Sequence, residues 1–85
     1  MTAPVVNEKV VTHWLNGLPA RNHRTTFHTD GQRLYSYALQ IGDTDEDSGF
    51  KVLRDHTAKG RWDYHSQTTS CHVGLARRGK GVLVV

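Results

Sequence analysis

Thr-Thr-Phe-His-Thr-Asp-Gly-Gln-Arg-Leu-Tyr-Ser-Tyr-Ala-Leu-Gln-Ile, residues 25–41, is the stretch that decides the fold. Asp30 and Gly31 lie between segments rich in β-branched and aromatic residues, a pattern typical of a two-residue type I′ turn between antiparallel strands. Such a turn would place Phe27 opposite Leu34 on one face of a hairpin. The other face would carry Tyr35, Tyr37, Leu39 and Ile41. Because both faces are partly apolar, we expect a helix to cover one, and the C-terminal segment, a partner or a second copy of the chain to cover the other.

One short helix is expected before this hairpin in the sequence, and another is expected near the C-terminus. Residues 7–17 place apolar side chains on one stripe and end at Gly17, which is typical of a helix C-terminus. The polar residues 66–70 offer N-caps for a second helix that would run to Arg78. Helices this short are unstable alone in water, so both should pack on the sheet.

Further strands are expected after the hairpin. Residues 50–57 have the composition of a strand, a turn follows at 58–61, and residues 61–67 would form another strand. The apolar run 82–85 would add a strand or cap the core. The sequence therefore predicts a single α+β domain over residues 1–85, with an antiparallel sheet of three to four strands and an N-terminal helix and a short C-terminal helix packed on it.

Composition excludes several classes of protein. The single cysteine, Cys71, cannot form an intramolecular disulfide framework. The longest apolar run, 82–85, is far shorter than the roughly 20 residues of a membrane helix. Residues 1–6 lack the charged and apolar blocks of a signal peptide. We therefore expect a soluble protein in a reducing cytoplasm, with no membrane contact.

The charge is distributed unevenly along the chain. Residues 1–42 carry a charge of +2, residues 43–49 carry −4 and residues 50–85 carry +5, which together give the net charge of +3. A basic C-terminal half suits a nucleic acid or an acidic protein as partner, although a few additional bases are also ordinary solubilising surface.

Metal and cofactor motifs are incomplete. The acidic loop 43–49 begins like a calcium-binding EF-hand loop, but Ser48 and Arg54 stand where the turn glycine and the bidentate glutamate belong. The six histidines and Cys71 form no closely spaced ligand pairs of the kind that structural zinc sites use. We therefore expect no metal and no cofactor, and interpret the acidic loop as a solvated connection.

Two groups of residues suggest catalysis. His56, Asp63 and His65 would lie together on neighbouring strands, where they could serve acid–base chemistry or simply form polar cross-strand pairs. Cys71 beside His72, near a helix N-terminus, could be a nucleophile or a buried structural cysteine. We favour the structural interpretation in both cases and expect no catalytic residue.

Aromatic and basic residues remain as candidates for partner binding. Aromatic rings among basic side chains can stack on nucleic-acid bases or anchor a protein partner, although in a small domain most rings belong to the core. The candidate partner-binding residues are Tyr35, Tyr37, Trp62, Tyr64, Arg77, Arg78 and Lys80.

Three segments together resemble a family of small uncharacterised proteins from bacteriophages and prophage-like elements. They are Asn16-Gly17, the hairpin residues 29–37, and Thr-Thr-Ser-Cys-His-Val at 68–73. The acidic loop 43–49 and the apolar end 82–85 are not part of the likeness, which supplies no functional residues. The resemblance implies a viral origin and expression in the cytoplasm of a bacterial or archaeal host.

These observations favour a non-enzymatic phage accessory protein that binds a host or viral macromolecule, most simply a protein, and inhibits a host defence or transcription complex. The alternative is a nucleic-acid-binding module in which the bases of the C-terminal half, including Lys59, contact phosphates and Trp62 or Tyr64 stacks on bases. A hydrolase built on His56, Asp63 and His65 is the third hypothesis. A homodimer would also cover an apolar sheet face.

Overall fold

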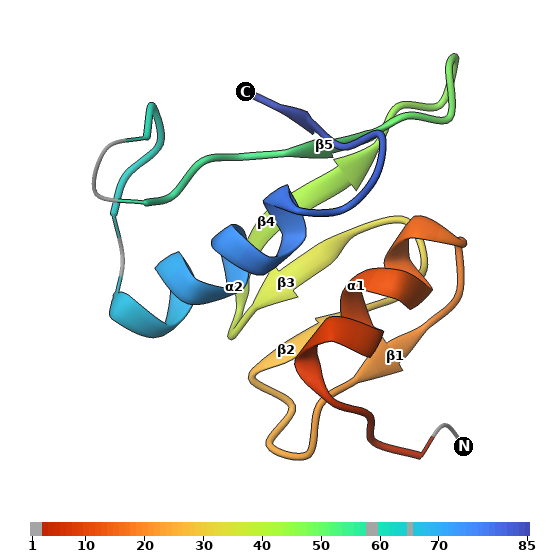
Figure 1. The fold of residues 1–85 in the computed structure, drawn as a ribbon, viewed down its shortest axis with the longest axis vertical. Coiled ribbons are helices and arrows are strands. Elements are labelled where there is room, and N and C mark those ends of the chain that lie inside the picture. The colour runs from red at the N-terminus through yellow and green to blue at the C-terminus, as the bar shows by residue number, and fades with distance from the viewer. Residues whose placement is uncertain (1–2, 58–59, 65) are drawn as a thin grey trace.

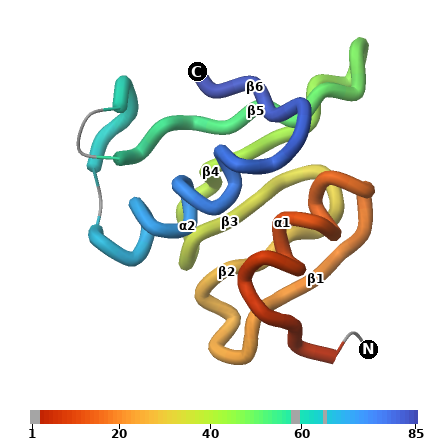
Figure 2. The backbone as a smooth tube through the Cα atoms, in the orientation of Figure 1, coloured from red at the N-terminus to blue at the C-terminus, as the bar shows by residue number. Residues whose placement is uncertain are grey.

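Within residues 3–57, 60–64 and 66–85, which the computed structural model describes, two helices lie on one side of a six-stranded sheet (Figure 1). The strands stand in the sheet in chain order (Figure 2). Neighbouring strands are antiparallel from β1 to β5, whereas β6 is parallel to β5 because α2 intervenes between them. The elements are α1 (Asn7–Leu15), β1 (Ala20–Arg21), β2 (Phe27–Thr29), β3 (Leu34–Ser36), β4 (Leu39–Thr44), β5 (Lys51–Leu53), α2 (Gln67–Arg77) and β6 (Leu83–Val84).

The α+β class and both helices are confirmed, but the expected three to four antiparallel strands are too few. The described chain has six strands, one of them parallel to its neighbour. β1 is only two residues long, and the single strand expected to run on from Leu34 is two strands, β3 and β4. The strand expected at 61–67 is absent from its described part, residues 61–64 and 66–67, and His65 lies outside the described residues.

The hairpin forms, but its loop is wider than two residues. The Asp30 carboxylate accepts hydrogen bonds from the backbone N–H groups of Gln32 and Arg33, at 2.9 and 2.8 Å. These bonds stabilise a four-residue loop, so Phe27 pairs with Ser36 instead of Leu34. A shift of two residues preserves the alternation of side chains. The predicted faces of β2 and β3 are therefore correct although the predicted register is wrong.

An unexpected turn separates β3 from β4. Tyr37 adopts a φ of +56°, a conformation that costs a residue with a side chain about 1–2 kcal/mol. Its N–H donates to the Thr26 carbonyl at 2.8 Å, and its carbonyl accepts from Nε2 of His28 at 3.1 Å. These contacts with β2 and with the residue before it hold the turn. As a result Leu39 and Ile41 face the core side, not the side of Tyr35.

Apolar side chains from both helices and the sheet form one core. The Trp14 indole lies against Gly42, where a Cβ atom would come within 2.8 Å of the ring, and its N–H donates to the Gln32 carbonyl at 3.0 Å. The core residues are Val10, Val11, Trp14, Phe27, Leu34, Ile41, Leu53, Val73 and Ala76.

The ends of both helices match their local sequence. Gly17 has the positive φ of +74° expected after α1, and the Ser66 hydroxyl caps α2 by accepting from the Thr69 N–H. No helix in the described chain is both long and apolar enough to cross a membrane.

A buried polar network joins α2 to β3. The Ser36 hydroxyl lies 2.7 Å from Nδ1 of His72 and 3.0 Å from the Thr69 hydroxyl. The His72 ring stacks on Phe27 with centroids 4.3 Å apart. Burial lowers the pKa of His72. The network therefore packs a neutral histidine against the sheet and fixes the position of α2.

Candidate functional site

Both helices pack on the same face of the sheet and leave the second face open (Figures 1 and 2). The alternation of burial along the strands separates the two faces. In β2, Phe27 and Thr29 are buried while His28 between them is partly exposed. In β3, Leu34 and Ser36 are buried and Tyr35 is partly exposed. His28 and Tyr35 therefore lie on what we call the open face, the side of the sheet away from α1 and α2.

Strand pairing arranges the side chains of the open face in a row across the strands. Arg21 of β1 pairs with His28, His28 pairs with Tyr35, and Tyr35 pairs with Gln40 of β4. Arg54, after β5, donates from Nη1 to the Gln40 carbonyl at 3.4 Å. The Arg54 guanidinium in turn lies 4.9 Å from the centre of the Trp62 ring. The cross-strand row consists of Arg21, His28, Tyr35, Gln40, Arg54 and Trp62.

The two rings at the middle of the row are held in place. His28 and Tyr35 stack with centroids 5.1 Å apart and planes 13° from parallel. Since a carbonyl oxygen only accepts, the contact with the Tyr37 carbonyl places the His28 proton on Nε2 and fixes the ring orientation. The exposed Arg33 guanidinium is a further cation beside the row, and a hydrogen bond with the Tyr35 hydroxyl raises its pKa.

Asp55 organises the loop that presents Trp62. Its carboxylate accepts from the Thr57 hydroxyl at 2.6 Å and from the Arg77 guanidinium at 3.0 Å. Its carbonyl accepts from the Trp62 N–H at 3.1 Å, and a Cβ at Gly60 would collide with the same carbonyl. The hydrogen bond from Thr57, more than the nearby Arg77, lowers the pKa of Asp55. The loop thereby leaves the Trp62 side chain exposed at the end of the row.

Positive charge predominates on this side of the sheet. Among the described residues, the open face carries Arg21, Arg33 and Arg54, and Asp43 is the carboxylate that strand pairing places there, opposite Val52. This face therefore has the charge that attracts phosphates or carboxylates.

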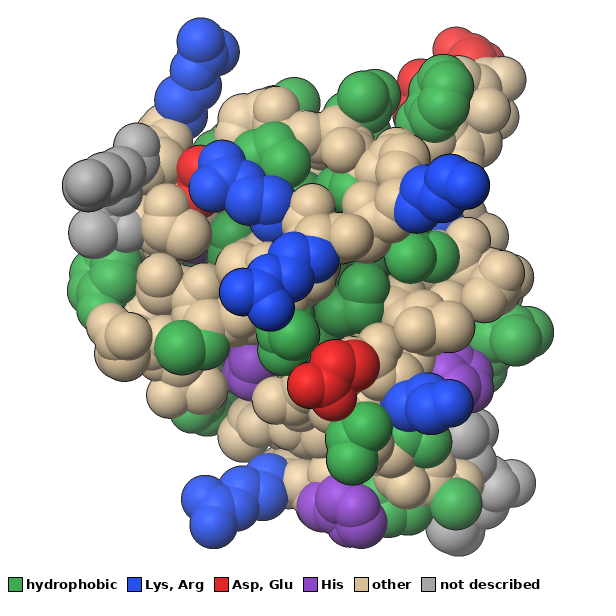
Figure 3. All heavy atoms as spheres, viewed as in Figure 1, with side chains coloured by type: hydrophobic (Ala, Val, Ile, Leu, Met, Phe, Trp, Pro, Cys, Tyr) green, Lys and Arg blue, Asp and Glu red, His purple; other side chains and the backbone are tan. Residues whose placement is uncertain are grey.

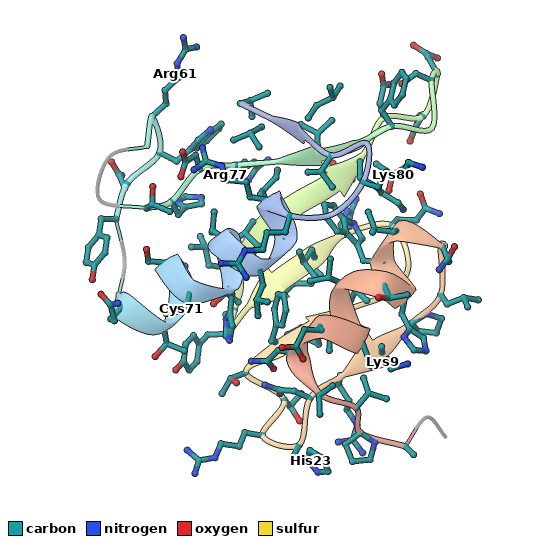
Figure 4. All side chains as sticks on the ribbon, viewed as in Figure 1. Lys9, His23, Arg61, Cys71, Arg77 and Lys80 are labelled. Atoms are coloured by element: carbon teal, nitrogen blue, oxygen red, sulfur yellow. The ribbon has the colours of Figure 1, made fainter. Side chains whose placement is uncertain are left out.

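The seven candidate partner-binding residues do not form one surface. Tyr35 and Trp62 belong to the cross-strand row. Tyr37 is half-exposed in the β3–β4 turn, and Tyr64 is exposed in the loop before α2. Three basic residues lie at or just after the C-terminal end of α2, on the helical side, where Arg77 pairs with Asp55 (Figure 4). They are Arg77, Arg78 and Lys80.

The helical side shows no single basic patch. Figure 3 views this side, and its Lys and Arg side chains are spread from one end of the molecule to the other. Figure 4 shows Arg61 projecting away from the rest of the chain, well separated from Lys9 on α1. Lys59, expected to contact phosphates, lies outside the described residues. The helical side therefore offers scattered charges, in contrast to the ordered row on the open face.

The residues considered for catalysis have other contacts. His56 donates from Nδ1 to the backbone carbonyl of Asp63 at 2.7 Å, so the contact uses the Asp63 carbonyl, whereas a catalytic pair needs the carboxylate. His65 lies outside the described residues. Cys71 is exposed on α2, whereas His72 beside it is buried against Phe27, so they point to different sides of the helix. Among the described residues, the His56 contact therefore joins a side chain to the backbone, and the side chains of Cys71 and His72 are not brought together.

The acidic loop folds on itself. The Asp45 carboxylate accepts from the Ser48 hydroxyl at 2.8 Å and from the Asp47 N–H at 3.2 Å. In the described part of the chain, no three His, Cys, Asp or Glu residues are grouped so that they could hold a metal ion.

Four members of the row were not among the predicted residues: Arg21, His28, Gln40 and Arg54. The alternation of Phe27, His28 and Thr29 was a usable signal for His28 once the strand was recognised. A two-residue strand such as β1 gives no signal for Arg21. Comparison of the chain with protein-family models, curated proteins and solved structures gives no match.

Proposed function

We propose that this protein is a non-enzymatic phage accessory protein that binds a host or viral macromolecule through the open face of its sheet. The observation that carries the proposal is the cross-strand row, in which rings and cations from separate strands are aligned on a face that neither helix covers. The resemblance of residues 29–37 and 68–73 to phage proteins supports the viral setting. Inhibition of a host defence or transcription complex in the host cytoplasm would follow from such binding.

The contacts within the row support binding. Side chains that are already ordered lose less conformational entropy when a partner binds. His28 and Tyr35 hold one another, and Arg54 is anchored at both Gln40 and Trp62. The contact between Ser36 and His72 has the residue types of a nucleophile and a base, but it belongs to the packing of α2, since Ser36 is fully buried.

The test compares two variants that remove the same kinds of side chain, one from the cross-strand row and one from positions outside it. The open-face variant is Arg21→Ala, Tyr35→Ala, Arg54→Ala. The control variant is Tyr64→Ala, Arg78→Ala, Lys80→Ala, which also removes one tyrosine and two cations. Tagged wild type and control should capture the same partner from a lysate of host cells, and the open-face variant should not.

Thermal unfolding of both variants checks that each is folded. Equal capture by the wild type and a folded open-face variant, or no specific capture by the wild type, would contradict the proposal.

A further inference from the structure

We infer that the macromolecule is a single-stranded nucleic acid, which crosses the strands along the cross-strand row, stacks bases on Tyr35 and Trp62 and places phosphates at Arg21, Arg33 and Arg54. The inference rests on the proposed function and names the partner of the same face.

The length and order of the row fit an extended nucleic-acid strand. Neighbouring β-strands are about 4.8 Å apart, so a row that runs from β1 past β5 spans on the order of 20 Å. Along it lie a cation, two rings, an amide, a cation and a ring. Proteins that bind single strands without sequence preference combine basic tracks with aromatic platforms in this manner, over several nucleotides. Gln40 adds an amide that can both donate to and accept from a base edge.

The exposed rings favour a single strand over a duplex. In a duplex the faces of the bases are stacked on each other, so an aromatic platform on the protein has nothing to bind. The sheet offers rings on an open surface and no described helix that could enter a groove on that side. The features of the row are therefore useful only for bases that are already unpaired.

Charge and composition favour a nucleic acid over a protein. The row itself contains no aliphatic side chain; the aliphatic residues that strand pairing places on the same face, Val52 and Leu83, lie beside each other on β5 and β6. Among the described residues of this side, three arginines are present for one carboxylate. Arginine is well suited to phosphate because its planar guanidinium can donate two parallel hydrogen bonds.

The direct test is fluorescence anisotropy with short labelled oligo(dT) and oligo(U), titrated with the full chain at increasing salt. For single strands the slope of log K against log salt is about −0.7 per neutralised phosphate, so three arginines predict a slope of about −2. Arg21→Ala or Arg54→Ala should each reduce the magnitude of the slope by about 0.7. The two oligonucleotides distinguish DNA from RNA as the preferred strand.

Aromatic stacking has its own pair of variants. Tyr35→Ala should weaken binding by a factor of roughly 5 to 150, the range measured for loss of one stacking ring. Tyr35→Phe keeps the ring and should bind like the wild type, which separates stacking from a general loss of folding. The control variant Tyr64→Ala, Arg78→Ala, Lys80→Ala should keep most of the affinity, and a duplex of the same length should compete poorly.

The inference is wrong if neither oligonucleotide binds at low salt, or if Tyr35→Ala and the two arginine variants bind like the wild type. Capture from a lysate treated with nuclease separates this failure from failure of the proposed function. If the nuclease-treated lysate still yields a protein that depends on the open face, the proposed function stands and the nucleic-acid inference falls. If no capture depends on the open face, both fall.

Discussion

Replacement of Ser36 by alanine tests the buried network that fixes α2 on the sheet. The substitution removes the hydroxyl that contacts Nδ1 of His72 at 2.7 Å and the Thr69 hydroxyl at 3.0 Å. Thr69 and His72 are only 2% and 3% exposed, so water cannot replace the lost partner. A buried polar group without a partner costs about 1–3 kcal/mol. We therefore expect the free energy of unfolding to fall by about 2 kcal/mol.

Urea unfolding followed by circular dichroism measures this free energy directly. In a domain of this size a loss of about 2 kcal/mol corresponds to a fall in Tm of about 8–16 °C. Ser70→Ala is the matched control, because Ser70 is partly exposed on α2, the helix that carries Thr69 and His72, and loss of its hydroxyl should change stability by no more than about 0.5 kcal/mol. If Ser36→Ala is as stable as Ser70→Ala, the network does not hold α2 and the reasoning is refuted.

Three further predictions concern pH and two buried charges. Burial lowers the pKa of His72, so stability should be full above pH about 6.5 and fall as the pH drops toward the folded-state pKa; a Tm that stays constant from pH about 7.5 to 5 would contradict this. Lys51→Met should lower the free energy of unfolding by about 1.5–3 kcal/mol in urea, because the Lys51 ammonium donates to the buried Gly31 carbonyl at 2.9 Å; wild-type stability would show that this bond is dispensable. Arg77→Ala should cost less than about 1 kcal/mol since Arg77 is half-exposed, whereas Asp55→Ala should cost more and shift the Trp62 fluorescence because it releases the loop; equal effects of the two variants would show that the ion pair, not the loop contacts, is what matters.

Elements with strong local signals could be predicted from the sequence. Gly17 follows the end of α1, and Ser66, one of the N-cap candidates at 66–70, caps α2, because capping depends on residues within one turn. The apolar run at 82–85 was expected to add a strand or cap the core, and the strand β6 forms there. The turn at Tyr37 could not be predicted, since its conformation depends on hydrogen bonds with His28 of β2 and with Thr26, the residue before β2.

The candidate site was harder to predict than the fold. Tyr35 and Trp62 were predicted as partner-binding residues because aromatic rings among basic side chains can stack on bases or anchor a protein partner. Their neighbours in the row come from other strands or from the segment after β5, and the register that sets His28 beside Tyr35 depends on the width of the loop at Asp30. Sequence patterns indicate which face a side chain shares within a strand, but not which side chains of other strands stand beside it.

The most direct test of the open face as the binding surface is amide NMR of isotopically labelled protein during addition of a short single-stranded oligonucleotide. The account predicts that signals of Arg21, His28, Tyr35 and Gln40 and the indole N–H of Trp62 shift together, while signals from the exposed side of α1 do not. Shifts confined to α1 and α2, or none at saturating oligonucleotide, would contradict it.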